Sequence, residues 1–167
     1  MTIADFDHLD IVKKKELLFN CCGSSSWVNE MLTVFPVNDL VDLLEYAEEK
    51  WYDCNPADWL EAFENYPKIG DMHLVKERYA KTSNYIESEQ AGVMDSSEEI
   101  RAELIKANEE YEDVFGYIFI VFATGKSAEE MLEILKERLE NDPRDEIMIA
   151  AAEQDKITKL RLKKLFD

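Results

Sequence analysis

Long segments without glycine or proline are the feature that most restricts how this chain can fold. Only five glycines and four prolines occur in 167 residues, and between them apolar side chains recur about every 3.6 residues, the repeat of an α-helix. Alternating β-branched runs, which would indicate strands, are few. The sequence therefore predicts an all-α protein, and its length suits a single-domain helical bundle over residues 1–167.

Caps and helix breakers divide the chain into expected helices. Gly23 is a typical helix end, and the serines at 24–26 can cap the next helix, which Phe35-Pro36 stops. Asn55-Pro56 is a strong start signal, because proline at the first helical position loses no hydrogen bond. The expected helices cover 13–22, about 26–35, 38–51, 56–63, about 74–80, 96 or 97 to 116, 128–140 and 142 to about 166.

Three segments are expected outside helices. Tyr66–Asp71 is predicted to be a loop, because the residue before a proline avoids the helical region and Gly70 follows. Lys81–Ser97 is a polar stretch. Tyr117–Ala123 is rich in isoleucine, valine and phenylalanine, which favours an extended conformation.

The helical repeat also predicts which side chains form the core. Trp27, Trp51 and Trp59 are expected inside the protein. The inward faces of two helices are expected to carry Leu40, Val41, Leu43, Leu44 and Ala47, and Ile100, Leu104, Ala107, Tyr111 and Val114.

The net charge of −18 disfavours nucleic acids and anionic membranes as partners, because both require clustered lysine and arginine. The longest near-apolar run, Tyr117–Ala123, is far shorter than the roughly 20 residues of a membrane span. No basic segment followed by an apolar stretch opens the chain, and its last residues, Lys164-Leu-Phe-Asp167, are not a peroxisomal address. We therefore expect a cytoplasmic protein.

The cysteines and histidines offer little support for a disulfide framework or a metal site. Cys21, Cys22 and Cys54 make an odd count with two neighbours in sequence. His8 and His73 are the two histidines, and neither belongs to a motif with metal-ligand spacing.

Taken singly, Glu89, Gln90 and Arg161 are most simply interpreted as solvated polar groups or ordinary ion pairs. Tyr66 is interpreted as an aromatic at the edge of the core whose hydroxyl reaches water.

Six segments, taken in their order along the chain, carry a more specific signal. They are Cys22-Gly-Ser-Ser-Ser-Trp-Val28, then Trp51 with Asp58-Trp-Leu-Glu-Ala-Phe63, Tyr66-Pro-Lys-Ile-Gly70, Glu89-Gln-Ala-Gly92, Asn108 through Tyr111 to Phe115-Gly-Tyr-Ile-Phe-Ile-Val121, and Lys156-Ile-Thr-Lys-Leu-Arg-Leu162. In this order they resemble the 2-oxo-4-hydroxy-4-carboxy-5-ureidoimidazoline (OHCU) decarboxylase family over nearly the whole chain. That family completes urate breakdown to (S)-allantoin in purine degradation.

The resemblance implies an activity and a set of site residues. It implies a cofactor-independent carboxy-lyase, homodimeric in the family's manner, that acts on a small anionic ureidoimidazoline. Catalytic roles fall on Tyr66, at the position of the family histidine, and on Glu89 and Arg161. The implied substrate contacts are Pro67, Ile86, Glu87, Ser88, Gln90, Val121, Phe122, Ala123, Thr124 and Gly125.

Three positions depart from the family pattern. Tyr66 replaces the acid–base histidine, and a phenol has a reference pKa near 10 against about 6.5 for imidazole. Ile86 stands where the family often has serine, and Phe35 precedes Pro36 where an arginine is usual.

Three interpretations are compatible with Tyr66: slow turnover with Tyr66 as donor, a non-catalytic or repurposed relative that binds a ureide ligand or acts as a helical interaction protein, or replacement of the histidine by design. His73 could supply an imidazole only if the loop folded back.

Overall fold

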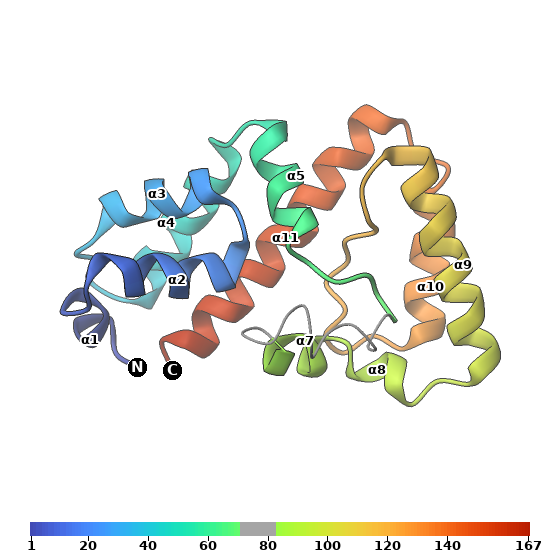
Figure 1. The fold of residues 1–167 in the computed structure, drawn as a ribbon, viewed down its shortest axis with the longest axis horizontal. Helices are drawn as coiled ribbons and strands as arrows, with labels where there is room; N and C mark the ends of the chain where they lie inside the picture. The colour runs from blue at the N-terminus through green and yellow to red at the C-terminus, as the bar shows by residue number, and fades with distance from the viewer. Residues whose placement is uncertain (71–82) are drawn as a thin grey trace. The chain divides into compact units, whose positions relative to one another are not determined.

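The computed structural model describes residues 1–70 and 83–167, which divide into two compact units. The first unit comprises residues 1–65 and 154–167, and the second comprises residues 66–153. Every regular element in the described part of the chain is a helix, which confirms the all-α prediction (Figure 1). None of these helices is long and apolar enough to cross a membrane.

Helices of the first unit pack around buried tryptophans. Helix α3 lies against α2, α4 and α5, and Trp27, Trp51 and Trp59 are buried as predicted. Two of the indole nitrogens donate inside this core, Trp27 to the Ala47 carbonyl and Trp59 to the Trp51 carbonyl, both at 3.0 Å. The elements are α1 Ile3–Asp7, α2 Ile11–Cys22, α3 Ser25–Val34, α4 Leu40–Tyr52, α5 Pro56–Glu64 and the end of α11, Pro143–Leu165.

Local caps set the ends of these helices close to the expected positions. Gly23 ends α2 with a φ of 85°, a left-handed conformation that favours glycine. Ser24 then caps α3 through its hydroxyl. Asn55 and Asp58 form a reciprocal capping box at the start of α5, with Pro56 as its first residue.

Replacing the cap residue Asn55 by alanine is expected to lower the free energy of unfolding by about 1 kcal/mol, because two backbone N–H groups of α5 lose their acceptor. Chemical denaturation would measure the change. Asn29→Ala is the matched control, because Asn29 is exposed within α3 and alanine favours a helix. Equal losses in both variants would contradict the importance of the cap.

Two expectations for the first unit need correction. Val41 was expected inside the core but is 64% exposed, whereas Leu43 and Ala47 are buried and Leu40 and Leu44 are half-buried. Two residues correspond to about 200° around a helix, so Val41 and Leu43 point to opposite faces. Helix α1 was not predicted, although a capping box of Thr2 and Asp5 marks its start.

In the second unit, the consecutive helices α9 and α10 pack against each other. The two helices lie side by side in Figure 1. Ser97 caps α9 and Gly116 ends it with a φ of 81°, while Ser127 caps α10, all as predicted. The elements are α7 Ser83–Glu89, α8 Ala91–Met94, α9 Glu98–Phe115, α10 Ala128–Arg138 and the start of α11.

The prediction for residues 81–97 was wrong in part, because this polar stretch contains helices α7 and α8. Val114, expected on the inner face of α9, is 54% exposed, and Ile100 is half-buried. The inner face continues instead through Phe115, whose ring centroid lies 4.6 Å from that of Tyr111.

Residues 66–70 form the predicted loop, and residues 118–123 form neither helix nor strand. The predicted helix at 74–80 and His73 lie outside the described residues.

Candidate functional site

A buried tyrosine–glutamate pair occupies the position of the expected acid–base site. Tyr66 opens the loop of residues 66–70, and its hydroxyl donates a hydrogen bond of 2.8 Å to Glu89 Oε2. Only 3% of Tyr66 and 2% of Glu89 is exposed. The interpretations of Glu89 as a solvated charge and of Tyr66 as an aromatic reaching water were therefore wrong. A phenol directed at a carboxylate in a dry environment forms a charge-assisted hydrogen bond.

The loop that carries Tyr66 is held from two sides. Gln90 Oε1 accepts a hydrogen bond of 3.1 Å from the Gly70 amide. Asn108 Nδ2, from α9, donates to the Ile69 carbonyl at 3.3 Å and to the Leu104 carbonyl at 2.8 Å. These bonds fix the backbone of the loop and with it the position of Tyr66.

The side-chain nitrogen of Gln90 is a buried hydrogen-bond donor. Gln90 is fully buried, and its Nε2 has no hydrogen-bond partner among the described residues. A buried donor without an acceptor costs free energy that a ligand oxygen would recover. Gln90 therefore holds the loop with one atom and offers a donor with another.

The remaining predicted contacts near α7 divide between two faces of the helix. Ile86 and Glu89 are buried, as is Gln90 directly after the helix, because positions i, i+3 and i+4 share one face. Pro67 is also buried in the neighbouring loop. Glu87 is half-buried and Ser88 is exposed, so these two do not join the buried group.

The segment Val121–Gly125 belongs to the same unit. Val121 and Ala123 are buried, Phe122 and Thr124 are half-buried, and Gly125 is an exposed turn residue with a φ of 79°. The Thr124 hydroxyl is buried and, within residues 1–70 and 83–167, has no hydrogen-bond partner. This segment thus presents a second unsatisfied polar group.

Gly92 allows α8 to approach the backbone that follows this segment. A Cβ atom built on Gly92 would lie 2.0 Å from the carbonyl oxygen of Lys126 and 3.1 Å from its carbonyl carbon. Because the obstacle is backbone, a side chain at position 92 would force the two segments apart.

We expect Gly92→Ala to lower the melting temperature, because overpacking against backbone typically costs about 1–3 kcal/mol. Thermal unfolding would measure the change. Ala91→Ser is a matched control at an exposed neighbouring position of α8. An unchanged melting temperature in Gly92→Ala would contradict the close approach.

Arg161 lies in the first unit, on α11. It is 4% exposed, and its Nη1 donates to the Asn20 carbonyl at 3.2 Å. The interpretation as a solvated surface charge was therefore wrong for this residue as well. A buried guanidinium keeps its positive charge at any physiological pH and suits planar anions.

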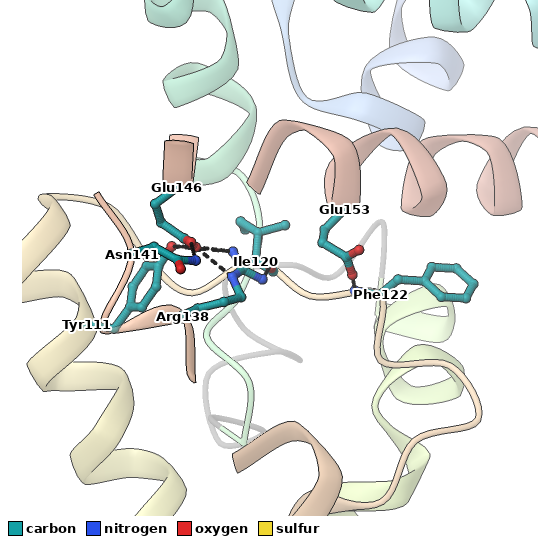
Figure 2. A network of polar contacts seen from close by, with 7 residues as sticks. All are labelled: Tyr111, Ile120, Phe122, Arg138, Asn141, Glu146 and Glu153. Atoms are coloured by element: carbon teal, nitrogen blue, oxygen red, sulfur yellow. Dashed lines mark hydrogen bonds and ion pairs between the residues drawn. The ribbon is translucent and has the colours of Figure 1, made fainter. Parts of the chain in front are cut away.

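A buried ion-pair network in the second unit escaped the sequence prediction. Figure 2 shows Glu146 accepting hydrogen bonds from Tyr111, Arg138 and Asn141. The Arg138 Nε–Glu146 Oε1 distance is 2.6 Å, and Arg138 Nη1 also donates to the Ile120 carbonyl at 2.6 Å. Burial raises the pKa of the Tyr111 phenol, which therefore stays protonated as a donor. No spacing in the sequence signals this set, since the loop between α10 and α11 separates Arg138 from Glu146.

No group of three or more histidine, cysteine, aspartate or glutamate side chains in residues 1–70 and 83–167 is arranged to hold a metal ion. Fold and site thus define an all-α protein with a buried phenol–carboxylate pair, and with a buried amide nitrogen and a buried hydroxyl that lack partners among the described residues.

Comparison with known proteins identifies the family. Residues 7–163 match the family model described as OHCU decarboxylase. The chain belongs to the OHCU decarboxylase family. A crystal structure of an OHCU decarboxylase in the presence of (S)-allantoin superposes with a TM-score of 0.77 at 37% identity, covering 91% of this chain and 97% of that one.

Curated relatives are longer proteins. The uric acid degradation bifunctional protein TTL of Arabidopsis thaliana is 39% identical over 87% of this chain and 45% of its own length. The uric acid degradation bifunctional protein of Bacillus sp. (strain TB-90) is 28% identical over 99% of this chain and 31% of its own length. The chain thus spans less than half the length of these relatives. An (S)-allantoin synthase structure, with a TM-score of 0.74 at 16% identity over the whole chain and 55% of that structure, shares the fold.

Proposed function

We propose that this chain decarboxylates OHCU to (S)-allantoin in urate degradation, without a cofactor. The observation that carries the proposal is the 2.8 Å hydrogen bond between the Tyr66 hydroxyl and Glu89, buried at the position of the family's acid–base histidine. Family membership and the structural similarity to an OHCU decarboxylase crystallised with (S)-allantoin support the same reaction.

The chemistry requires a proton donor on one face of the substrate. When the bond between the carboxylate carbon and the ring carbon breaks, CO₂ leaves and the electron pair is delocalised into the ring. The ring carbon then takes a proton, which we assign to the Tyr66 hydroxyl, and solvent returns a proton to Tyr66. A donor fixed on one side accounts for a single product enantiomer.

The other site residues have binding roles in this proposal. Glu89 accepts hydrogen bonds from ureido or ring N–H groups, and the unsatisfied Gln90 Nε2 donates to a carbonyl oxygen of the substrate. Arg161 binds the substrate carboxylate, because a guanidinium forms paired hydrogen bonds with planar anions. The predicted contacts from Pro67, Ile86 and Val121–Gly125 complete the set.

The second candidate is a protein that binds a ureide ligand without turning it over. It rests on Tyr66, because a neutral phenol with an ordinary pKa near 10 is a poor proton donor at pH 7 compared with imidazole. This candidate retains the binding roles of Gln90 and Arg161 but not the proton transfer.

The deciding experiment supplies freshly generated OHCU to the purified protein and follows chiral allantoin by circular dichroism, with calorimetry of (S)-allantoin binding in parallel. We expect turnover above the spontaneous rate and at least tenfold weaker binding in Arg161→Ala. Arg144→Ala is the control, because Arg144 is exposed on the same helix. Binding without turnover would favour the second candidate, and neither binding nor turnover would overturn both.

We also propose that residues 1–167 act as one decarboxylase domain that forms a homodimer in the cytoplasm. The family model supports one domain, because its match runs through both compact units. Cys21, Cys22 and Cys54 form no disulfide, which is consistent with a reducing compartment. Light scattering on the purified protein would measure the oligomeric state, and a monomer at micromolar concentration would contradict the dimer.

A further inference from the structure

Side chains bind the backbone of residues 120–122, which lie in a segment (118–123) that belongs to neither a helix nor a strand. Arg138 Nη1 donates to the Ile120 carbonyl at 2.6 Å. Two residues later, the Phe122 amide donates to Glu153 Oε2 at 2.6 Å, as Figure 2 shows. Lys126 Nζ donates to the Phe122 carbonyl at 2.7 Å. Charged side chains therefore bind backbone groups on both sides of residue 121.

The Arg138 side chain is itself held by neighbouring side chains. Glu146, fully buried, accepts from Arg138, Tyr111 and Asn141. The Arg138 guanidinium also lies 4.7 Å from the centre of the Phe119 ring. A planar guanidinium held by a carboxylate and an aromatic ring directs its remaining N–H group in one direction, here towards the Ile120 carbonyl.

Glu153 differs from Arg138 in exposure, because Glu153 is half-buried on α11 and Arg138 is buried. The hydrogen bond from the Phe122 amide to Glu153 lies inside the segment that also contains the buried Thr124 hydroxyl. Replacing Glu153 therefore removes a direct contact to the segment and leaves the Arg138–Glu146 pair in place.

We propose that Glu153 and Arg138 are positioning residues for ligand binding by Val121–Gly125: they hold the backbone of this segment in its binding conformation through the Phe122 amide and the Ile120 carbonyl. The inference rests on the proposed function, because it assigns the segment to the ureidoimidazoline site. Without these two contacts the ligand must order the segment when it binds. Binding of substrate and of product is then weaker to the same extent, whereas the rate of proton transfer is unchanged.

The test compares Glu153→Ala with Glu153→Gln, whose side-chain carbonyl can still accept from the Phe122 amide. We expect Glu153→Ala to raise KM and the Kd for (S)-allantoin about five- to tenfold with kcat within about twofold, and Glu153→Gln to stay within about twofold in all three. Glu133→Ala is the matched control, because Glu133 is exposed on α10. Melting temperatures of all variants identify any general loss of fold.

A second readout does not depend on activity. Amide hydrogen exchange of a peptide covering residues 117–127 is expected to be faster in Glu153→Ala and in Arg138→Lys than in the wild type, and unchanged in Glu133→Ala. Arg138→Lys keeps the positive charge beside Glu146 but loses the planar fork.

The outcomes separate this inference from the proposed function. If the wild type binds allantoin and turns over OHCU while Glu153→Ala behaves like it in KM, Kd and exchange, the positioning role alone is wrong. An equal fall in kcat for Glu153→Ala and Glu153→Gln would also overturn it, because the carboxylate would then act in chemistry. If the wild type neither binds allantoin nor turns over OHCU, the proposed function is wrong. Faster exchange of residues 117–127 in the variants would then show an effect on the backbone but no role in ligand binding.

Discussion

Replacing Tyr66 by histidine is expected to raise kcat for OHCU decarboxylation by about 10²-fold or more, because a positioned general acid with a pKa near the working pH typically contributes 10²- to 10⁴-fold. The wild-type phenol donates to Glu89 at 2.8 Å, so this site already holds a donor within reach of a carboxylate. An imidazole in the same place has an ordinary pKa of about 6.5, near the working pH, which suits proton transfer better than a phenol with an ordinary pKa near 10.

The pH dependence of the two proteins gives an independent check. The histidine variant is expected to lose activity as the pH rises through the imidazole pKa, whose ordinary value is about 6.5. The wild type is expected to lack this limb, because a phenol stays protonated through neutral pH. Steady-state rates from pH 5.5 to 9 would measure both profiles.

Tyr66→Phe is the matched control for this experiment, because it keeps the ring and removes only the hydroxyl. If Tyr66 is the donor, Tyr66→Phe should lose the residual activity of the wild type. A folded Tyr66→His variant no faster than Tyr66→Phe would contradict the assignment of this position to proton transfer. It would then favour the binding protein over the enzyme.

The second large effect is expected on stability. Glu146→Ala should lower the free energy of unfolding by about 3–5 kcal/mol, because it leaves the buried Arg138 guanidinium without its carboxylate. Glu146 is fully buried and 6% of Arg138 is exposed, so water cannot replace the lost partner. Tyr111 and Asn141 lose their acceptor at the same time. Urea denaturation monitored by far-UV circular dichroism, which reports the helices of both units, would measure the change.

An exposed ion pair between α9 and α10 offers the control. Lys136 and Glu103 lie 3.2 Å apart, with 59% and 57% of their side chains exposed. Glu103→Ala is expected to change the free energy of unfolding by less than about 1 kcal/mol, because exposed ion pairs contribute little. The double variant Arg138→Met with Glu146→Leu should be more stable than Glu146→Ala, since it removes both charges. Similar losses for Glu146→Ala and Glu103→Ala would show that the buried network is not important for stability.

Sequence alone was sufficient for most helix ends and for the family. Gly23, Ser24, Asn55, Ser97, Gly116 and Ser127 act at the predicted boundaries, because caps and left-handed turns depend on groups within about four residues. The three tryptophans are buried because their large apolar surface is costly to expose. The order of six short motifs was enough to identify a family that the comparisons confirm.

Tertiary structure decided what the site is made of. The same sequence pattern is compatible with a solvated or a buried Glu89, and only the packing of α7 against the loop at 66–70 brings it to the Tyr66 hydroxyl. Val41 and Val114 are apolar but exposed, since a helical repeat does not specify where the edge of the core lies. The Arg138–Glu146 pair depends on how α10 and α11 meet. Local hydrogen bonds are encoded over a few residues, whereas burial and ion pairing depend on segments that are distant in sequence and become neighbours only in the folded chain.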